Sequence, residues 1–217
     1  MIDVERDPTA PAGLSDRDLR APDVLEALYR CFLGKCYLCE GSVTLSSFHV
    51  EHRVPRGHDN TREHDWTNLF PCCEGCNLRR KKGYPDGGLL DPAGRQSVDS
   101  RLEQRIADWP GFEPRPYFAA KDPTDLAAVN TAAELDRIHN DGTTSLKAAD
   151  LRHAILTHQR RVFRQCLYYL HNTAISEHER QVVRTHLRLL LSRRAPYTAL
   201  TRAELVPLGP DIVALFD

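Results

Sequence analysis

Two Cys-x-x-Cys pairs, Cys36–Cys39 and Cys73–Cys76, constrain what this chain of 217 residues can fold into. Such pairs are typical of a closed structural site in which four thiolates hold one Zn²⁺ ion tetrahedrally. Cys72 could replace Cys73, but Cys73 and Cys76 repeat the spacing of the first pair. We therefore expect Cys36, Cys39, Cys73 and Cys76 to bind zinc and to tie together the ends of the segment between them. Buried free cysteines are the alternative.

Composition sets the broad class of protein. Hydrophobic residues make up 41% of the chain and charged residues 27%, as in ordinary globular chains that build a core. No stretch approaches the about 18 apolar residues of a membrane span, and the N-terminus lacks the basic and apolar regions of a signal peptide. Metal-binding thiolates fit a reducing compartment better than a disulfide scaffold does. We therefore expect a cytoplasmic protein without a membrane partner.

Hydrophobic periodicity and turn residues predict an α+β fold, in which a small zinc-tied module precedes a mainly helical region. A partly alternating apolar pattern predicts a β-hairpin within residues 43–55. Residues 83–123 are punctuated by Pro and Gly, so we expect them to be mostly irregular, with one helix near residues 98–108. The other expected helices cover residues 22–32, 74–82, 124–139, 145–170 and 176–192. The corresponding units are an arm and helix (1–34), the zinc module (35–92), an irregular linker (93–123) and the helical region (124–217).

The net charge of −1 hides an uneven distribution along the chain. Residues 53–82 hold seven Arg/Lys against four Asp/Glu, and residues 147–194 hold ten against three, with five histidines. The intervening residues 83–146 are acidic, with eleven Asp/Glu and six Arg/Lys. Basic faces bind phosphates, but charge runs are also common as solvated helix faces. The two basic regions therefore fit a nucleic-acid partner without requiring one.

Polar side chains of mixed chemistry lie between and just after the cysteine pairs. Glu51 and His52 occupy a strand-like segment, Asn68 precedes the second pair, and Asn77 follows it directly. A basic run, Arg79-Arg80-Lys81-Lys82, comes next. A carboxylate, an imidazole, an amide and a basic run around one zinc-tied loop favour a phosphodiesterase.

Each of these residues also has a structural interpretation. Glu51 could be a surface acid, His52 a structural histidine and Asn68 a cap or turn residue. Adjacent strand residues point to opposite faces, so Glu51 and His52 can share a metal only if the strand is distorted. His49 lies two residues before Glu51, which would bring it to the same face as that carboxylate.

The order of these motifs resembles the HNH endonucleases of the ββα-metal superfamily, in the subgroup with a structural four-cysteine zinc site. The motifs cover residues 35–92 and read Lys35-Cys-Tyr-Leu-Cys-Glu40, Val50-Glu-His52, Trp66-Thr-Asn-Leu69, Cys73-Glu-Gly-Cys-Asn77 and Leu89-Leu-Asp-Pro92. This set is most similar to the nuclease subunit of Septu-type and retron-associated anti-phage systems, in which the HNH protein accompanies an ABC/SMC-like ATPase. The chain departs from the common pattern with Glu51 in place of Asp, and with Arg56-Gly57-His58 in place of Gly-Gly after Pro55.

The resemblance implies a role for each site residue. His52 would be the general base that takes a proton from the attacking water. Glu51 and Asn77 would hold a catalytic Mg²⁺ or Mn²⁺ through oxygen ligands. Asn68 would orient His52 by hydrogen bonds across the loop. The basic run, Arg79, Arg80, Lys81 and Lys82, would bind the phosphates that flank the scissile bond.

These roles together describe a metal-dependent HNH endonuclease that hydrolyses phosphodiester bonds in nucleic acid. The resemblance implies that it is the effector subunit of an ATPase-containing anti-phage defence complex, with DNA as substrate and tRNA as the alternative. We expect residues 124–217 to dock the ATPase. Two other hypotheses stay open: a non-catalytic zinc-stabilised module that binds nucleic acid or protein, and a stand-alone restriction-type nuclease.

Overall fold

The chain folds as a mixed α+β structure in a computed structural model, which confirms the expected fold class. The structure describes residues 1–81, 83–108, 114–141 and 145–217, with side chains from residue 148 onward in the last range. Within these ranges the helices are α1 (Pro22–Cys31), α2 (Glu74–Arg79), α3 (Val98–Arg101), α4 (Leu126–Asn140), α5 (Ser145–His171), α6 (Glu177–Leu191), α7 (Thr198–Leu205) and α8 (Pro210–Val213). The strands are β1 (His49–His52), β2 (Leu69–Cys72), β3 (Leu102–Ala107) and β4 (Arg115–Ala120). Short 3₁₀ turns are η1 (Ala12–Asp16), η2 (Asn60–Arg62), η3 (Trp66–Asn68) and η4 (Val206–Leu208).

Strand β1 pairs antiparallel with β2, so the predicted hairpin within residues 43–55 is wrong. His52 lies opposite Leu69 and His49 lies opposite Cys72. The two strands are joined by a long loop instead of a tight turn, and Asp59 and Asp65 cap the 3₁₀ turns η2 and η3 within or next to it. The apolar alternation before residue 49 belongs to a turn-rich segment, in which only Ser42 forms a bridge, to Lys35.

Helix α2 follows β2 directly and completes a β-β-α unit. Cys73 is its N-cap, and the Cys73 sulfur accepts from the backbone N–H of Cys76. The helix ends at Arg79, earlier than predicted, because Arg80 has an extended backbone. The last residues of β1 and the last turn of α2 therefore lie close to one another.

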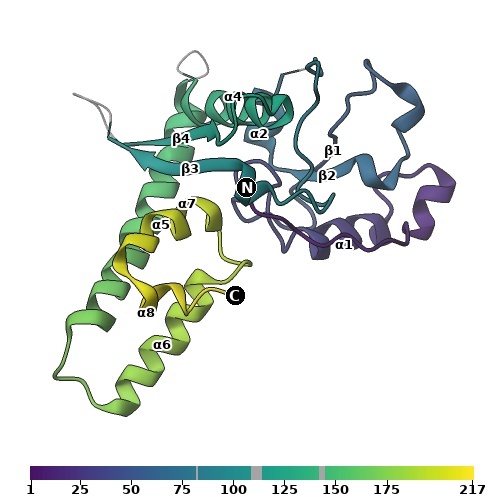
Figure 1. The fold of residues 1–217 in the computed structure, drawn as a ribbon. Helices are drawn as coiled ribbons and strands as arrows, with labels where there is room; N and C mark the ends of the chain where they lie inside the picture. The colour runs from purple at the N-terminus through teal and green to yellow at the C-terminus, as the bar shows by residue number, and fades with distance from the viewer. Residues whose placement is uncertain (82, 109–113, 142–144) are drawn as a thin grey trace.

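The predicted irregular linker, residues 93–123, contains a β-hairpin in which β3 pairs with β4. The expected helix near residues 98–108 is a single turn, α3, that leads straight into β3. Leu102 and Gln104 are buried and Glu103 and Arg105 are exposed, which is the alternation of a strand with one covered face. In Figure 1 the hairpin lies between α4 on one side and α7 on the other.

The predicted long helices are present as α4, α5 and α6. A capping box, in which Ser176 and Glu179 bind each other's backbone N–H groups, begins α6 as expected. Two hydrophobic clusters form. The first joins the zinc module, α1, the hairpin and α4, and it includes Phe70, Leu135 and Ile155. The second joins α5, α6, α7 and α8 around Val162, Leu187, Leu191, Leu205 and Ile212.

The N-terminal segment, expected as an extended arm, packs onto the module. The Arg6 guanidinium lies over the rings of Trp66 and Phe70 and donates to the carbonyls of Trp66 and Leu69, at the start of β2. Val4 and Leu14 are buried. This packing carries Leu19 and Arg20 towards β1. Across the described residues, the helices are too short or too polar to cross a membrane.

Candidate functional site

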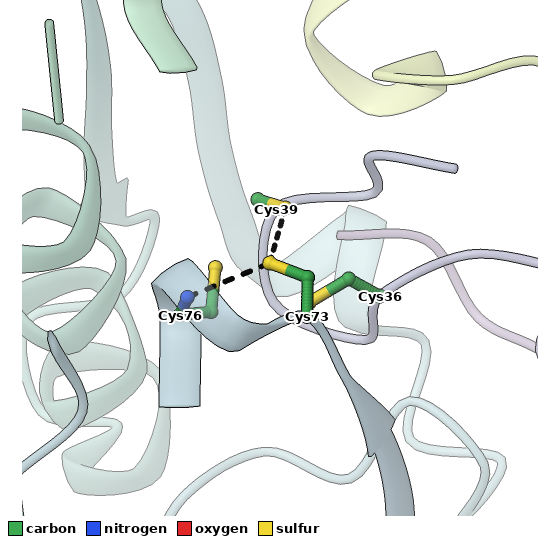
Figure 2. A group of neighbouring side chains, drawn as sticks. All are labelled: Cys36, Cys39, Cys73 and Cys76. Atoms are coloured by element: carbon green, nitrogen blue, oxygen red, sulfur yellow. Dashed lines mark hydrogen bonds between the residues drawn. The ribbon is translucent and has the colours of Figure 1, made fainter. Parts of the chain in front are cut away.

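The four predicted cysteines converge on one point and are placed to bind a metal ion. Their sulfur atoms all lie within 4.8 Å of one another, and Cys39 and Cys73 are 3.8 Å apart. Four sulfurs around zinc, each about 2.3 Å from it, would be about 3.8 Å apart. Figure 2 shows Cys36 and Cys39 on the loop after α1 facing Cys73 and Cys76 at the start of α2. The buried thiol of Cys72, the alternative ligand, stands outside this set.

The close approach of the four thiols shifts their pKa values in opposite directions. Burial raises the pKa of Cys36, but hydrogen bonds from the neighbouring thiols lower it by more. The pKa of Cys36 therefore lies well below its usual range. Sharing hydrogen bonds with Cys36 holds the pKa of Cys39 and Cys76 well above theirs. A metal ion can replace the remaining protons, so that all four cysteines bind it as thiolates. The donor set and the geometry fit a structural zinc.

A cleft of about 580 Å³ lies between β1, the loop after it, the end of α2 and the N-terminal segment. It brings together five of the predicted site residues: Glu51, His52, Asn77, Arg80 and Lys81. Its other lining residues are Leu19, Arg20, His49, Val50, Pro55, Arg56 and Gly57. Glu51 and His52 share it because His52 is the last residue of β1, where the chain bends away from strand geometry.

The ring of His52 is held by one backbone contact. Its Nε2 atom lies 2.8 Å from the carbonyl oxygen of Glu63, in the loop between β1 and β2. A carbonyl oxygen only accepts, so Nε2 carries the hydrogen and Nδ1 has the free lone pair. The side chain is 8% exposed, which leaves little freedom to rotate. His52 thus offers a single basic nitrogen in a fixed orientation.

Asn68 is fully buried and clamps both sides of this loop. Its Oδ1 accepts from Val54 N at 2.8 Å, and its Nδ2 donates to the carbonyls of Val54 and Arg62 at 3.0 and 3.1 Å. Its side chain makes no hydrogen bond to His52, and Asn68 does not line the cleft. Arg62 directly precedes Glu63, the residue that binds His52. Asn68 therefore reaches His52 through the loop backbone.

Arg80 contradicts the expectation that it binds phosphate. Its side chain is only 4% exposed, and its guanidinium pairs with Glu51 and donates to the carbonyls of His52 and Arg53. Arg80 thus fixes the Glu51 carboxylate against the end of β1. Arg79 is also buried, on the far side of α2 from the cleft lining, so the phosphate-binding role is corrected for both residues.

The asparagine and the exposed cations of the cleft complete the site. The amide of Asn77 makes no hydrogen bond to another described residue, so its oxygen is available as a ligand. Lys81 lines the cleft and is exposed, and Lys82 lies outside the described residues. Sequence reasoning missed Arg20 and Arg56. Arg56 follows the Glu51–Pro55 motif, which could have pointed to it, but Arg20 reaches the cleft only through tertiary packing.

A scan against protein-family models gives no match for this chain, and a search of curated proteins finds no relative. The arrangement of the side chains is therefore the basis for assigning a function.

Proposed function

We propose that this cleft is the active site of a metal-dependent HNH endonuclease that hydrolyses phosphodiester bonds in nucleic acid. The observation that carries the proposal is the fixed His52 ring, which lines the same cleft as Glu51 and Asn77 and whose Nδ1 has no hydrogen-bond partner among the described residues. A lone histidine on a strand needs no such partners. An imidazole held by its other nitrogen beside two oxygen ligands is what hydrolysis of a phosphodiester requires.

His52 is the general base in this proposal. Its Nδ1 takes a proton from the water that attacks phosphorus, and the Nε2–H bond to Glu63 stabilises the imidazolium that forms. The same bond prevents the ring from turning away during the proton transfer. Asn68 keeps Glu63 in place by holding the loop on both sides.

Glu51 and Asn77 fit a hard divalent ion, Mg²⁺ or Mn²⁺. Both side chains line the cleft, and both offer oxygen atoms, the ligands that these ions prefer. Arg80 binds Oε1 of Glu51, which leaves Oε2 for the ion. When bound, the ion supplies stabilisation of negative charge on the phosphate and on the leaving 3′ oxygen.

Arg20, Arg56 and Lys81 take the phosphate-binding role that the sequence assigned to the whole basic run. All three are exposed side chains on the lining of the cleft, and Arg56 also pairs with the carboxylate of Glu63 at 2.8 Å. Positive charge there attracts a phosphodiester backbone. The substrate we propose is DNA, with tRNA as the alternative.

A cleavage panel tests the proposal. Duplex DNA, single-stranded DNA and tRNA are incubated with Mg²⁺ or Mn²⁺ and with wild type, His52→Ala or the matched control His64→Ala, whose histidine lies outside the cleft. Loss of a general base lowers rates about 10²–10⁴-fold. We expect that loss for His52→Ala only, with zinc content and helicity unchanged. Full activity of His52→Ala on every substrate would refute the mechanism.

A non-catalytic module that binds nucleic acid or protein is favoured by one observation: Arg80 already neutralises Glu51. That function predicts binding without cleavage and no affinity for Mn²⁺ beyond the zinc site. Calorimetric titration of zinc-loaded protein with Mn²⁺, compared with Glu51→Gln, separates the two functions. Binding that Glu51→Gln weakens supports the nuclease.

We also propose that the protein is the effector subunit of an anti-phage complex with an ABC/SMC-like ATPase, docked through residues 124–217. The motif resemblance over residues 35–92 supports this, together with the size of the helical region. Co-expression with an ABC/SMC-like ATPase encoded beside this chain tests it. A stand-alone nuclease would elute alone and cleave without ATP.

A further inference from the structure

One exposed face of helix α5 carries three arginines and no acidic residue. Seven exposed residues from 153 to 171 lie on it, and none is acidic: His153, Thr157, Arg160, Arg161, Arg164, Tyr168 and His171. We call these residues the α5 basic face. At about 1.5 Å per residue they extend for about 27 Å.

The α5 basic face points away from the core of the molecule. Val162 and Cys166 on the opposite side of α5 are fully buried in the second hydrophobic cluster. Arg160 and Arg164 are each two residues from Val162, which places them about 160° round the helix from it. Packing against α6 and α7 therefore leaves these arginines in solvent.

The charges on this face are not neutralised by the protein. None of the guanidinium groups of Arg160, Arg161 and Arg164 forms an ion pair or hydrogen bond with another described residue. Burial lowers the pKa of His158, and the charge of Arg161 lowers it further. Like charges four residues apart disfavour a helix. Within the described residues, no ion pair offsets the repulsion between these arginines.

These arginines line a shallow groove of about 370 Å³ together with Thr157 and Gln165, and with no acidic or apolar residue. Arg, Gln and Thr side chains are donors to phosphate oxygens in nucleic-acid complexes. Protein interfaces instead have an apolar centre. Tyr168, 45% exposed one turn beyond Arg164, offers a ring on which an unpaired base can stack.

We propose that the α5 basic face is a second nucleic-acid-binding surface, separate from the cleft. This face binds the phosphodiester backbone of the substrate. It shares no residue with the cleft lining. The inference rests on the proposed function for the identity of its ligand. Its role is to hold a long substrate while the cleft engages one bond.

Fluorescence anisotropy with a labelled 20-base-pair duplex and a labelled 20-nucleotide single strand tests this inference on the full, zinc-loaded protein without added Mg²⁺ or Mn²⁺. Arg160→Gln/Arg161→Gln/Arg164→Gln is compared with Arg17→Gln/Arg188→Gln/Arg194→Gln. The second triple variant removes three exposed arginines that lie on other elements, so both variants have the same net charge.

We expect the α5 variant to bind the duplex at least tenfold more weakly than the scattered variant at low salt. Each lost phosphate contact lowers the slope of log Kd against log salt by about 0.9, so the slope should fall by about 2.7. Stronger loss with the single strand than with the duplex assigns the face to unpaired bases. Equal binding by the two triple variants would overturn the inference.

Poly-glutamate of the same charge is the competitor that tests an acidic protein partner. If it displaces the duplex from wild type as well as unlabelled duplex does, the face is a general polyanion surface and the nucleic-acid assignment fails. The two proposals also fail separately. If wild type cleaves and the α5 variant binds and cleaves equally well, only this inference fails. If binding depends on the α5 arginines but wild type does not cleave, only the nuclease proposal fails.

Discussion

At the scale of single residues, Asn68 shows how a buried amide can control a site that it does not touch. It satisfies three backbone groups of the loop that holds His52. Net stabilisation by each buried hydrogen bond is about 1 kcal/mol. We expect Asn68→Ala to lower the free energy of unfolding by about 3 kcal/mol and to reduce cleavage, with zinc retained. Urea unfolding followed by the fluorescence of the buried Trp66 measures this.

The matched variant is Asn68→Asp, which keeps the acceptor for Val54 N–H but places a carboxylate against the carbonyls of Val54 and Arg62. It should therefore be no more stable than Asn68→Ala. If Asn68→Asp behaves like wild type, the two donor contacts are unimportant.

The Glu51–Arg80 pair gives a second prediction at this scale. Removing one partner of a buried pair leaves the other charge unpaired, at a cost of about 3–5 kcal/mol, and less here because Glu51 is 21% exposed. We expect Arg80→Met to lower the free energy of unfolding by about 2–3 kcal/mol. The double variant Glu51→Gln/Arg80→Met should lose less than the sum of the single variants.

Arg80→Lys is the control for charge alone. One ammonium group cannot match the guanidinium fork that reaches Glu51, His52 O and Arg53 O, so we expect intermediate stability. Strict additivity in the double-variant cycle would mean that Glu51 and Arg80 do not interact.

The sequence predicted which cysteines meet better than it predicted which basic side chains are exposed. The zinc ligands follow from spacing, and the structure confirms that they converge. Arg79, Arg80 and Lys81 are consecutive basic residues, yet two are buried and one is exposed. What separates them is the end of α2 at Arg79 and the packing of β1 against it, which a run of like residues does not encode.

At the scale of elements, the long helices and the strand-like segment of Glu51 and His52 were predictable, whereas the strand pairing and the second hairpin were not. Val98, Leu102 and Ile106 are four residues apart, which fits a helix, while Leu102, Gln104 and Ile106 also alternate as in a strand. Pairing with β4 decides for the strand. The partner of β1 was also missed, because a long loop separates β1 from β2. The zinc site and the contacts of Asn68 hold the two strands together across that loop.

Helix α4 carries a pH-sensitive contact. His139 is 1% exposed, packs on Phe118 with ring centroids 4.8 Å apart, and contacts the Leu135 carbonyl through Nδ1. Burial lowers its pKa from 6.5 to about 4. Between these values the unfolded chain binds a proton that the folded chain does not, so stability is full above pH 6.5 and falls as the pH drops towards 4.

We expect wild type to lose about 2 kcal/mol more than His139→Gln between pH 7 and pH 5, because each unit below 6.5 costs about 1.4 kcal/mol. Glutamine can still donate to the Leu135 carbonyl but does not titrate. Urea unfolding of both proteins at the two pH values measures the difference, and protonation at the zinc thiols cancels because it is common to both. Parallel losses would mean that His139 titrates normally in the folded state.

At the scale of the whole molecule, the two hydrophobic clusters differ in whether they contain cysteines of the four-sulfur set. The first contains Cys36, Cys39 and Cys76, and the second contains no zinc ligand. Figure 1 shows α6 and α8 at the opposite end of the molecule from β1 and β2. We therefore expect the proposed reaction centre to depend on a metal ion at the four cysteines, whereas the second cluster packs against the opposite side of α5 from the α5 basic face.

Zinc removal should therefore separate the two parts in hydrogen exchange. Structural zinc supplies about 10–16 kcal/mol to small zinc-binding peptides, which is comparable to the whole stability of a domain, about 5–15 kcal/mol. We expect Cys73→Ala to lose zinc and the amide protection of β1, β2 and α2, while α6 amides that pack on Val162 and Cys166 stay protected.

Cys72→Ala, which removes a buried thiol outside the four-sulfur set, should keep one zinc and full protection. If instead Cys72→Ala loses zinc and Cys73→Ala keeps it, the fourth ligand is the adjacent Cys72. Loss of protection throughout the molecule would mean that the two clusters unfold as one unit.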